Sequence, residues 1–214
     1  MTILSEELRN KIRDKEARIG IIGMGYVGIP LGLEFTNNGF NVLGFDKDKK
    51  RIDSINEGKQ VMKHIKQKDM ANFIANKGSA TNDSSKLNEM DCLIICVPTP
   101  LSKNGNPDVS FIESALRDVV DHVHEGMLII LESTIYPGAT KELLLPKFQN
   151  NDGLALEVGD QIFIAFSPER VDPGRTDWTI TNTPKVVGGI TPQCCDIAHS
   201  LYARFVEHVI TVSD

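Results

Sequence analysis

The chain alternates between short apolar runs and longer segments with helical periodicity, with turns rich in glycine, proline and asparagine between them. The short runs are apolar at consecutive positions, which is typical of parallel strands buried on both faces. The longer segments repeat apolar side chains at the spacing of amphipathic helices. This alternation predicts an α/β fold: a Rossmann-like, doubly wound, mostly parallel sheet with helices on both faces.

The predicted strands share an apolar run that ends in a turn, and they cover residues 18–22, 41–45, 92–97, 127–131, 161–166, 185–187 and 208–212. The predicted helices cover residues 26–38, 47–57, 60–76, 111–123, 139–148 and 192–205. Residues 3–17 predict a further amphipathic helix, which we interpret as a leader rather than a core element. We therefore expect a helical leader over residues 1–17 and a Rossmann-like domain over residues 18–214.

Composition excludes several classes of protein. The 214 residues are 41% hydrophobic and 24% charged, which is typical of a globular chain and excludes disorder and low complexity. A net charge of −6 argues against a nucleic-acid partner or an anionic membrane partner. No apolar run reaches the ~20 residues of a membrane span, and the charged first residues lack the apolar stretch of a secretory signal. We expect a cytoplasmic protein.

The cysteines indicate packing rather than chemistry. None of the four, Cys92, Cys96, Cys194 and Cys195, has the ligand spacing of a zinc site. The first two lie in an apolar run, and the last two are adjacent in sequence. We interpret them as reduced packing residues and expect no metal site.

The first apolar run ends in Gly23-Met24-Gly25-Tyr26-Val27-Gly28, directly before a predicted helix. This glycine spacing in this context predicts a dinucleotide-binding turn. Gly23 permits the tight turn, Gly25 lets a pyrophosphate approach the backbone, and Gly28 lets the helix pack closely on the strand. The helix N-terminus offers N–H groups and a partial positive charge to the phosphates.

An acidic residue, Asp46, ends the second apolar run, about 20 residues after Gly25. A carboxylate at this place accepts hydrogen bonds from the adenosine ribose and repels a 2′-phosphate, so it favours NAD over NADP. Arg51 is a candidate to flank the adenosine, although the basic cluster around it leaves NADP open. The alternative is that Asp46 only caps the next helix.

Polar turns follow three later apolar runs and introduce Thr99, Thr134 and the pair Glu169-Arg170. Because parallel strands end at one edge of a sheet, we expect these turns to lie together beside the dinucleotide. The threonine hydroxyls can contact cofactor or a reactive water, and Glu169 is a candidate general base or water-positioning group. Arg170 and Arg175 can face an anionic substrate. The alternative is ordinary turn residues and a solvated Glu-Arg pair.

The chain strongly resembles the UDP-glucose/GDP-mannose dehydrogenase family in five segments, in the order IGIIGMGYVGIPLG, FDKDKKRI, VPTPLSKNGNPDVSFI, ESTIYPGAT and FSPERVDPGR. The resemblance implies a nucleotide-sugar 6-dehydrogenase that oxidises a C6 alcohol to a carboxylate with two NAD molecules, through a cysteine thiohemiacetal and a thioester, for surface-polysaccharide synthesis. The SPERVDPG segment is most similar to the branch that oxidises UDP-N-acetylglucosamine or a related UDP-N-acetylhexosamine. UDP-glucose is the alternative substrate.

The resemblance also implies residue roles. The implied NAD-binding set is Gly23, Gly25, Tyr26, Val27, Gly28, Asp46, Arg51, Val97, Pro98, Thr99, Ser133, Thr134 and Glu169. Thr134 and Glu169 are also implied to lie near the catalytic water. The implied substrate rim comprises Phe166, Ser167, Pro168, Glu169 and Arg170.

The sequence departs from the family in three respects, the first being that it contains no Cys-x-Pro-x-Asp motif, which carries the family's nucleophile. The family's catalytic lysine and asparagine are also missing, and family members are about twice as long. We interpret the chain as a fragment, the N-terminal NAD-binding domain, which binds NAD without completing the oxidation. We expect it to be mostly monomeric and the parent enzyme to be a homodimer. The alternatives are a non-catalytic NAD(H)-sensing Rossmann module and a dehydrogenase of the β-hydroxyacid or 6-phosphogluconate type.

Overall fold

The computed structural model describes residues 2–101, 105, 107–149, 156–170 and 179–212. Its strands are β1 (Arg18–Ile22), β2 (Asn41–Phe45), β3 (Gly78–Thr81), β4 (Cys92–Ile95), β5 (Leu128–Leu131), β6 (Phe163–Phe166), β7 (Lys185–Gly189) and β8 (Val209–Val212). Its α-helices are α1 (Ile3–Asp14), α2 (Gly28–Asn37), α3 (Lys49–Asn56), α4 (Gln67–Ala75), α5 (Ser110–Val120), α6 (Leu145–Gln149) and α7 (Pro192–Tyr202).

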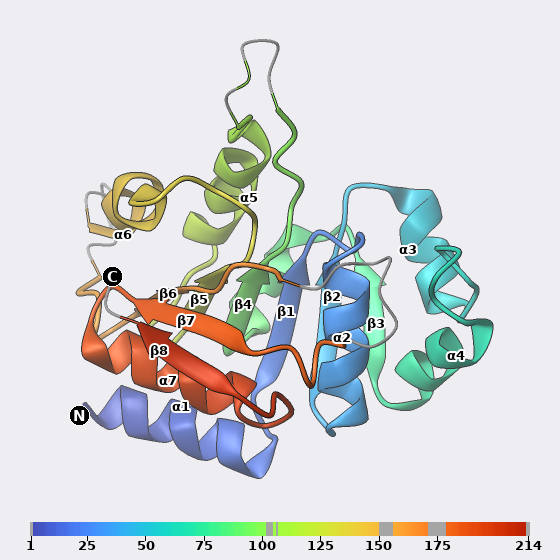
Figure 1. The fold of residues 1–214 in the computed structure, drawn as a ribbon, viewed down its shortest axis with the longest axis horizontal. Helices are drawn as coiled ribbons and strands as arrows, with labels where there is room; N and C mark the ends of the chain where they lie inside the picture. The colour runs from blue at the N-terminus through green and yellow to red at the C-terminus, as the bar shows by residue number, and fades with distance from the viewer. Residues whose placement is uncertain (1, 102–104, 106, 150–155, 171–178, 213–214) are drawn as a thin grey trace.

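Within the described residues the strands form one eight-stranded sheet in the order β3-β2-β1-β4-β5-β6-β7-β8 (Figure 1). The strands from β3 across to β6 are parallel, β7 runs antiparallel to β6, and β8 is parallel to β7. The order reverses beside β1, where the chain passes to β2 on one side and to β4 on the other. This is the place at which doubly wound sheets bind ligands.

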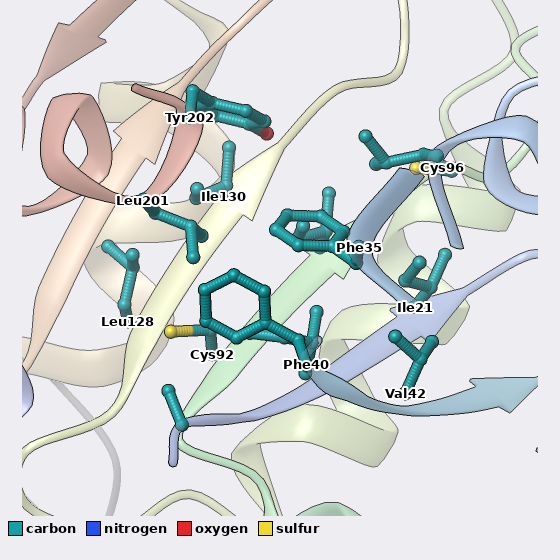
Figure 2. Close-up of a cluster of buried hydrophobic side chains, with 14 of the residues drawn as sticks. Ile21, Phe35, Phe40, Val42, Cys92, Cys96, Leu128, Ile130, Leu201 and Tyr202 are labelled. Atoms are coloured by element: carbon teal, nitrogen blue, oxygen red, sulfur yellow. The ribbon is translucent and has the colours of Figure 1, made fainter. Parts of the chain in front are cut away.

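Strand β4 shows how the sheet buries both faces. Cys92 and Ile94 contribute to a core cluster with α1, α2, α4 and α7, whereas Leu93 and Ile95 contribute to a second cluster with α5 and α6. Figure 2 shows part of the first cluster, in which the aromatic ring of Phe35 lies over the sheet. The prediction of a mostly parallel sheet with helices on both faces is confirmed.

The expectation that the N-terminal helix is a leader outside the core is wrong, because α1 contributes side chains to the core. Leu8 and Ile12 are 3% and 1% exposed and belong to the core cluster that includes α7. Figure 1 shows α1 beside α7 along one face of the sheet. Full burial of one such side chain contributes about 1.5–3 kcal/mol, so α1 stabilises the domain.

Three local predictions also need correction. The segment predicted as a helix over residues 60–76 is helical only in α4, and β3 follows it where no strand was predicted. A 3₁₀-helix, Ser84–Glu89, then precedes β4. The helix predicted over residues 139–148 begins as a π-helical turn, Thr140–Leu144, before α6.

Candidate cofactor site

The glycine turn connects β1 to α2, and two of its glycines are required by close packing. Gly23 has a positive φ of 97°, and a Cβ there would lie 2.8 Å from the carbonyl oxygen of Cys96. A Cβ on Gly28 would lie 2.1 Å from the carbonyl oxygen of Gly23. These contacts hold the first turn of α2 against the ends of β1 and β4.

Gly25 differs, because a Cβ there would meet nothing within 4 Å. Its missing side chain therefore leaves open space rather than relieving a contact inside the domain. Next to this space, the N–H groups of Gly25, Tyr26 and Val27 pair with no acceptor in the described part of the chain. No side chain caps α2. Free donors beside an uncovered backbone fit the diphosphate of a dinucleotide.

Asp46 lies next to this turn and is held by three hydrogen bonds. Its Oδ2 accepts from the N–H of Met24 at 3.0 Å and from the guanidinium of Arg51 at 2.9 Å. Its Oδ1 accepts from the N–H of Asp48 at 2.9 Å. A carboxylate has about four acceptor positions, so Oδ1 keeps capacity for a ribose hydroxyl.

The alternative role of Asp46 as a helix cap is wrong. The N-cap of α3 is Asp48, whose side chain accepts from the N–H groups of Lys50 and Arg51. Asp46 is instead the residue that joins the end of β2 to the glycine turn. Its side chain is 8% exposed, and that of Arg51 is 36% exposed.

The turns after β4 and β5 are joined by Ser133. This buried side chain donates a hydrogen bond from Oγ to the carbonyl oxygen of Val97 at 2.7 Å. Thr134 is exposed and Thr99 is half-buried, so both can meet a ligand, and Pro98, next to Thr99 in the chain, is exposed. The structure thus brings these residues to one edge of the sheet, while their role in NAD binding stays a prediction.

The turn after β6 continues the same edge. Its implied substrate residues differ in exposure: Ser167 is fully buried, Phe166, Pro168 and Glu169 are half-buried, and Arg170 is exposed. The N–H of Arg170 donates to the carboxylate of Glu169 at 2.8 Å. Arg175 lies outside the described residues. The proximity of this turn to the other two follows from the register of Leu131 with Phe166.

All four cysteines are buried. Burial raises the pKa of the Cys92 and Cys96 thiols well above the usual value and also raises that of Cys195. A raised thiol pKa lowers the fraction of reactive thiolate. The burial of all four cysteines agrees with the packing role that their sequence context predicts.

The sequence did not predict two features of this edge. Tyr26, which the resemblance implies to be an NAD-binding residue, is 65% exposed and stacks on His64 with ring centroids 5.0 Å apart, and this contact brings the loop before α4 to the glycine turn. Glu132, Lys185 and Tyr202 form a buried polar cluster behind the turn after β5. The one local signal for this cluster is a glutamate at the end of the apolar run LIIL.

The fold and the glycine turn define a dinucleotide-binding domain of the Rossmann type. Residues 17–206 match the family model described as the UDP-glucose/GDP-mannose dehydrogenase family, NAD binding domain. The chain belongs to this family, as its motifs predict, and its cofactor is NAD.

Curated relatives agree with this assignment. The chain is 34% identical over 204 residues to UDP-N-acetyl-D-mannosamine dehydrogenase of Escherichia coli strain K12, covering 92% of this chain and 48% of the relative. It is 32% identical over 191 residues to UDP-N-acetyl-D-glucosamine 6-dehydrogenase of Salmonella typhi, covering 89% of this chain and 44% of the relative. The chain thus spans about half the length of these relatives.

Solved structures agree as well. UDP-D-ManNAc dehydrogenase from Pyrococcus horikoshii superposes with a TM-score of 0.83 at 32% identity, covering 92% of this chain and 47% of that one. NDP-N-acetyl-D-galactosaminuronic acid dehydrogenase from Methanosarcina mazei superposes with a TM-score of 0.84 at 30% identity, covering 100% and 46%. The family consists of oxidoreductases that act on nucleotide sugars. Among the described residues, no helix is long and apolar enough to span a membrane.

Proposed function

We propose that this chain is the NAD-binding part of a nucleotide-sugar 6-dehydrogenase, which oxidises the C6 alcohol of a UDP-N-acetylhexosamine to a uronate for polysaccharide synthesis. One observation carries the cofactor half of this proposal. The open space at Gly25 adjoins unpaired backbone donors, and Asp46 is hydrogen-bonded to the same turn. This arrangement suits a diphosphate followed by an adenosine ribose.

In this proposal the two ends of the dinucleotide meet different residues. The N–H groups of the glycine turn bind the diphosphate, Asp46 accepts from the ribose, and Arg51 flanks the adenosine. Thr99, Thr134 and Glu169 then lie toward the nicotinamide, which supplies the hydride acceptor when NAD is bound. Glu169 is half-buried at the rim, a position suited to orienting a water molecule.

The second part of the proposal concerns the identity of the sugar substrate. Relatives named for UDP-N-acetyl-D-mannosamine and for UDP-N-acetyl-D-glucosamine support a 2-acetamido sugar, in agreement with the resemblance of the SPERVDPG segment. N-acetylglucosamine, favoured by the sequence resemblance, and N-acetylmannosamine are both candidates within this class. UDP-glucose is the alternative. We further propose that these 214 residues do not complete the oxidation alone, because their four thiols are buried.

Calorimetry of this chain with NAD, NADP and UDP-sugars tests the proposal. We expect NAD to bind with a dissociation constant between micromolar and millimolar, about −4 to −8 kcal/mol. NADP should bind more weakly, because its 2′-phosphate meets the carboxylate of Asp46. UDP-sugars should bind weakly or not at all. A chain that binds no NAD at millimolar concentration contradicts the proposal.

A further inference from the structure

Three polar side chains from three separate elements meet in the interior behind the cofactor edge. The Lys185 ammonium lies 2.8 Å from Oε1 of Glu132, with side-chain exposures of 8% and 0%. The Tyr202 hydroxyl donates to the same carboxylate oxygen. The ammonium also lies 4.7 Å from the centroid of the Tyr202 ring, within reach of a cation–π contact.

The cluster lies directly behind the turns after β5 and β6, which carry Thr134 and Glu169, two residues predicted to face the nicotinamide. Glu132 is the residue before Ser133 and Thr134, and its N–H donates to the carbonyl of Ile95 as a continuation of the parallel ladder. Register pairs Leu131 with Phe166, so the next residues, Glu132 and Ser167, lie beside each other on the same sheet face. Figure 2 shows the hydroxyl end of Tyr202 directed away from its helix and over the strands on this face.

The positive charge of Lys185 links the buried cluster to Glu169 in the turn after β6. Because β7 is antiparallel to β6 and Gly188 pairs with Phe166, Lys185 lies beyond the carboxyl end of β6, beside the turn that carries Glu169. Burial opposes the charge on Lys185, yet the carboxylates of Glu132 and Glu169 raise its pKa. One ammonium therefore interacts with a buried carboxylate and with the rim carboxylate.

A purely structural role explains this cluster poorly. Replacing a buried ion pair with apolar residues is often neutral or stabilising, so such a pair is weak evidence for stability alone. Two buried polar atoms of this region, Oε2 of Glu132 and Oγ of Ser167, have no hydrogen-bond partner in the described part of the chain. A polar network that is incomplete within the described residues and adjoins a binding edge fits a role in positioning.

We propose that Lys185 is a positioning residue: fixed by Glu132 and Tyr202, its ammonium holds the Glu169 carboxylate and the Ser133–Thr134 turn in place for the nicotinamide half of NAD. This inference rests on the proposed function. It predicts that the cluster affects the nicotinamide half and not the adenosine half, because the latter meets the glycine turn and Asp46 at the other end of the site.

The test compares NAD with ADP, which carries the adenosine and the diphosphate but neither the nicotinamide nor its ribose. Calorimetry should show Lys185→Met weakening NAD binding about tenfold while ADP binding changes less than about twofold. Tyr202→Phe keeps the ring and should weaken NAD less than Lys185→Met. Lys11→Met is the matched control, because Lys11 pairs with Asp91 at 2.7 Å before the amino end of β4. It should change neither affinity.

The outcomes separate the inference from the proposed function. Wild-type chain that binds neither NAD nor ADP overturns both. Lys185→Met that binds NAD normally, or that weakens NAD and ADP equally, overturns the inference alone. Circular dichroism checks folding, and the double variant Glu132→Gln/Lys185→Met removes both charges in case the single variant unfolds. The double variant should show the same selective loss of NAD, and an equal loss of both ligands there also overturns the inference.

Discussion

The carboxylate of Asp46 accepts a hydrogen bond from the backbone N–H of Met24 at 3.0 Å, so the end of β2 is tied to the glycine turn after β1. The same oxygen accepts from Arg51 at 2.9 Å, which draws the first turn of α3 to the same point. The two sequence signals for a dinucleotide therefore belong to one hydrogen-bonded unit. A substitution in the glycine turn should therefore disturb Asp46, and a substitution of Asp46 should disturb the glycine turn, so that either one affects cofactor binding.

Asp46→Ala should weaken NAD binding and narrow the preference for NAD over NADP. The substitution removes the predicted ribose acceptor and the charge that repels a 2′-phosphate. Hydrogen bonds to charged groups contribute about 1.5–3 kcal/mol, so we expect a loss of about tenfold or more. Asp46→Asn keeps an acceptor for Met24 without the charge and should lie between Ala and wild type. Calorimetry with both nucleotides measures the effect, and unchanged NAD affinity in Asp46→Ala removes Asp46 from the site.

Gly25→Ala should weaken NAD binding without affecting stability, whereas Gly28→Ala should lower the stability of the fold. A Cβ on Gly25 meets nothing within 4 Å, so this variant should fold normally and lose NAD affinity about tenfold or more, because the methyl group occupies the approach to the diphosphate. A Cβ on Gly28 would lie 2.1 Å from a carbonyl oxygen, so that variant should lose about 1–3 kcal/mol of stability.

Thermal unfolding and calorimetry on both glycine variants distinguish these effects. At this chain length about 1 kcal/mol corresponds to about 2–4 °C in Tm. Gly28→Ala should therefore unfold several degrees below wild type, whereas Gly25→Ala should unfold at the same temperature as wild type. A Gly25→Ala variant that binds NAD as tightly as wild type contradicts the placement of the diphosphate.

The contrast between β1 and β3 explains how far the sequence predicts this fold. After the exposed Arg18, the residues of β1 are apolar at consecutive positions, as are all residues of β4 and β5, because these strands are buried on both faces, and this pattern is visible locally. Strand β3, Gly78–Thr81, lies at the edge of the sheet and consists of small residues without an apolar run. Its pairing with β2 depends on tertiary contacts, which no local pattern records.

The residues of the candidate site likewise include some that a local sequence pattern predicts and others that only tertiary contacts bring together. Gly23, Gly25 and Asp46 were predictable because fixed spacing after a strand carries the signal. Lys185 and Tyr202 were not, since their contacts with Glu132 depend on the pairing of β7 with β6 and on the packing of α7 against the sheet. The helix α1 was predicted, but its burial against α7 depends on contacts between the two ends of the chain.

Alkaline pH should destabilise the domain through the buried cluster. Burial, together with the nearby Glu132 carboxylate, raises the pKa of the Tyr202 hydroxyl well above 10. The folded chain therefore keeps this proton where the unfolded chain has lost it, so stability falls as pH rises above about 10. Urea unfolding between about pH 8 and pH 11 should show this decline, and Tyr202→Phe should flatten it. An equally steep decline in the variant contradicts this cause.

The folded chain should show neither rapid thiol chemistry nor sustained oxidation. Its cysteines are buried, and burial raises the pKa of the Cys92 and Cys96 thiols. A thiol reagent should therefore react slowly with the native chain and quickly with all four cysteines in denaturant. With NAD and UDP-N-acetylglucosamine, UDP-N-acetylmannosamine or UDP-glucose, absorbance should show no steady formation of NADH. Steady turnover by these 214 residues would mean that a buried cysteine becomes accessible or that the chemistry needs no thiol.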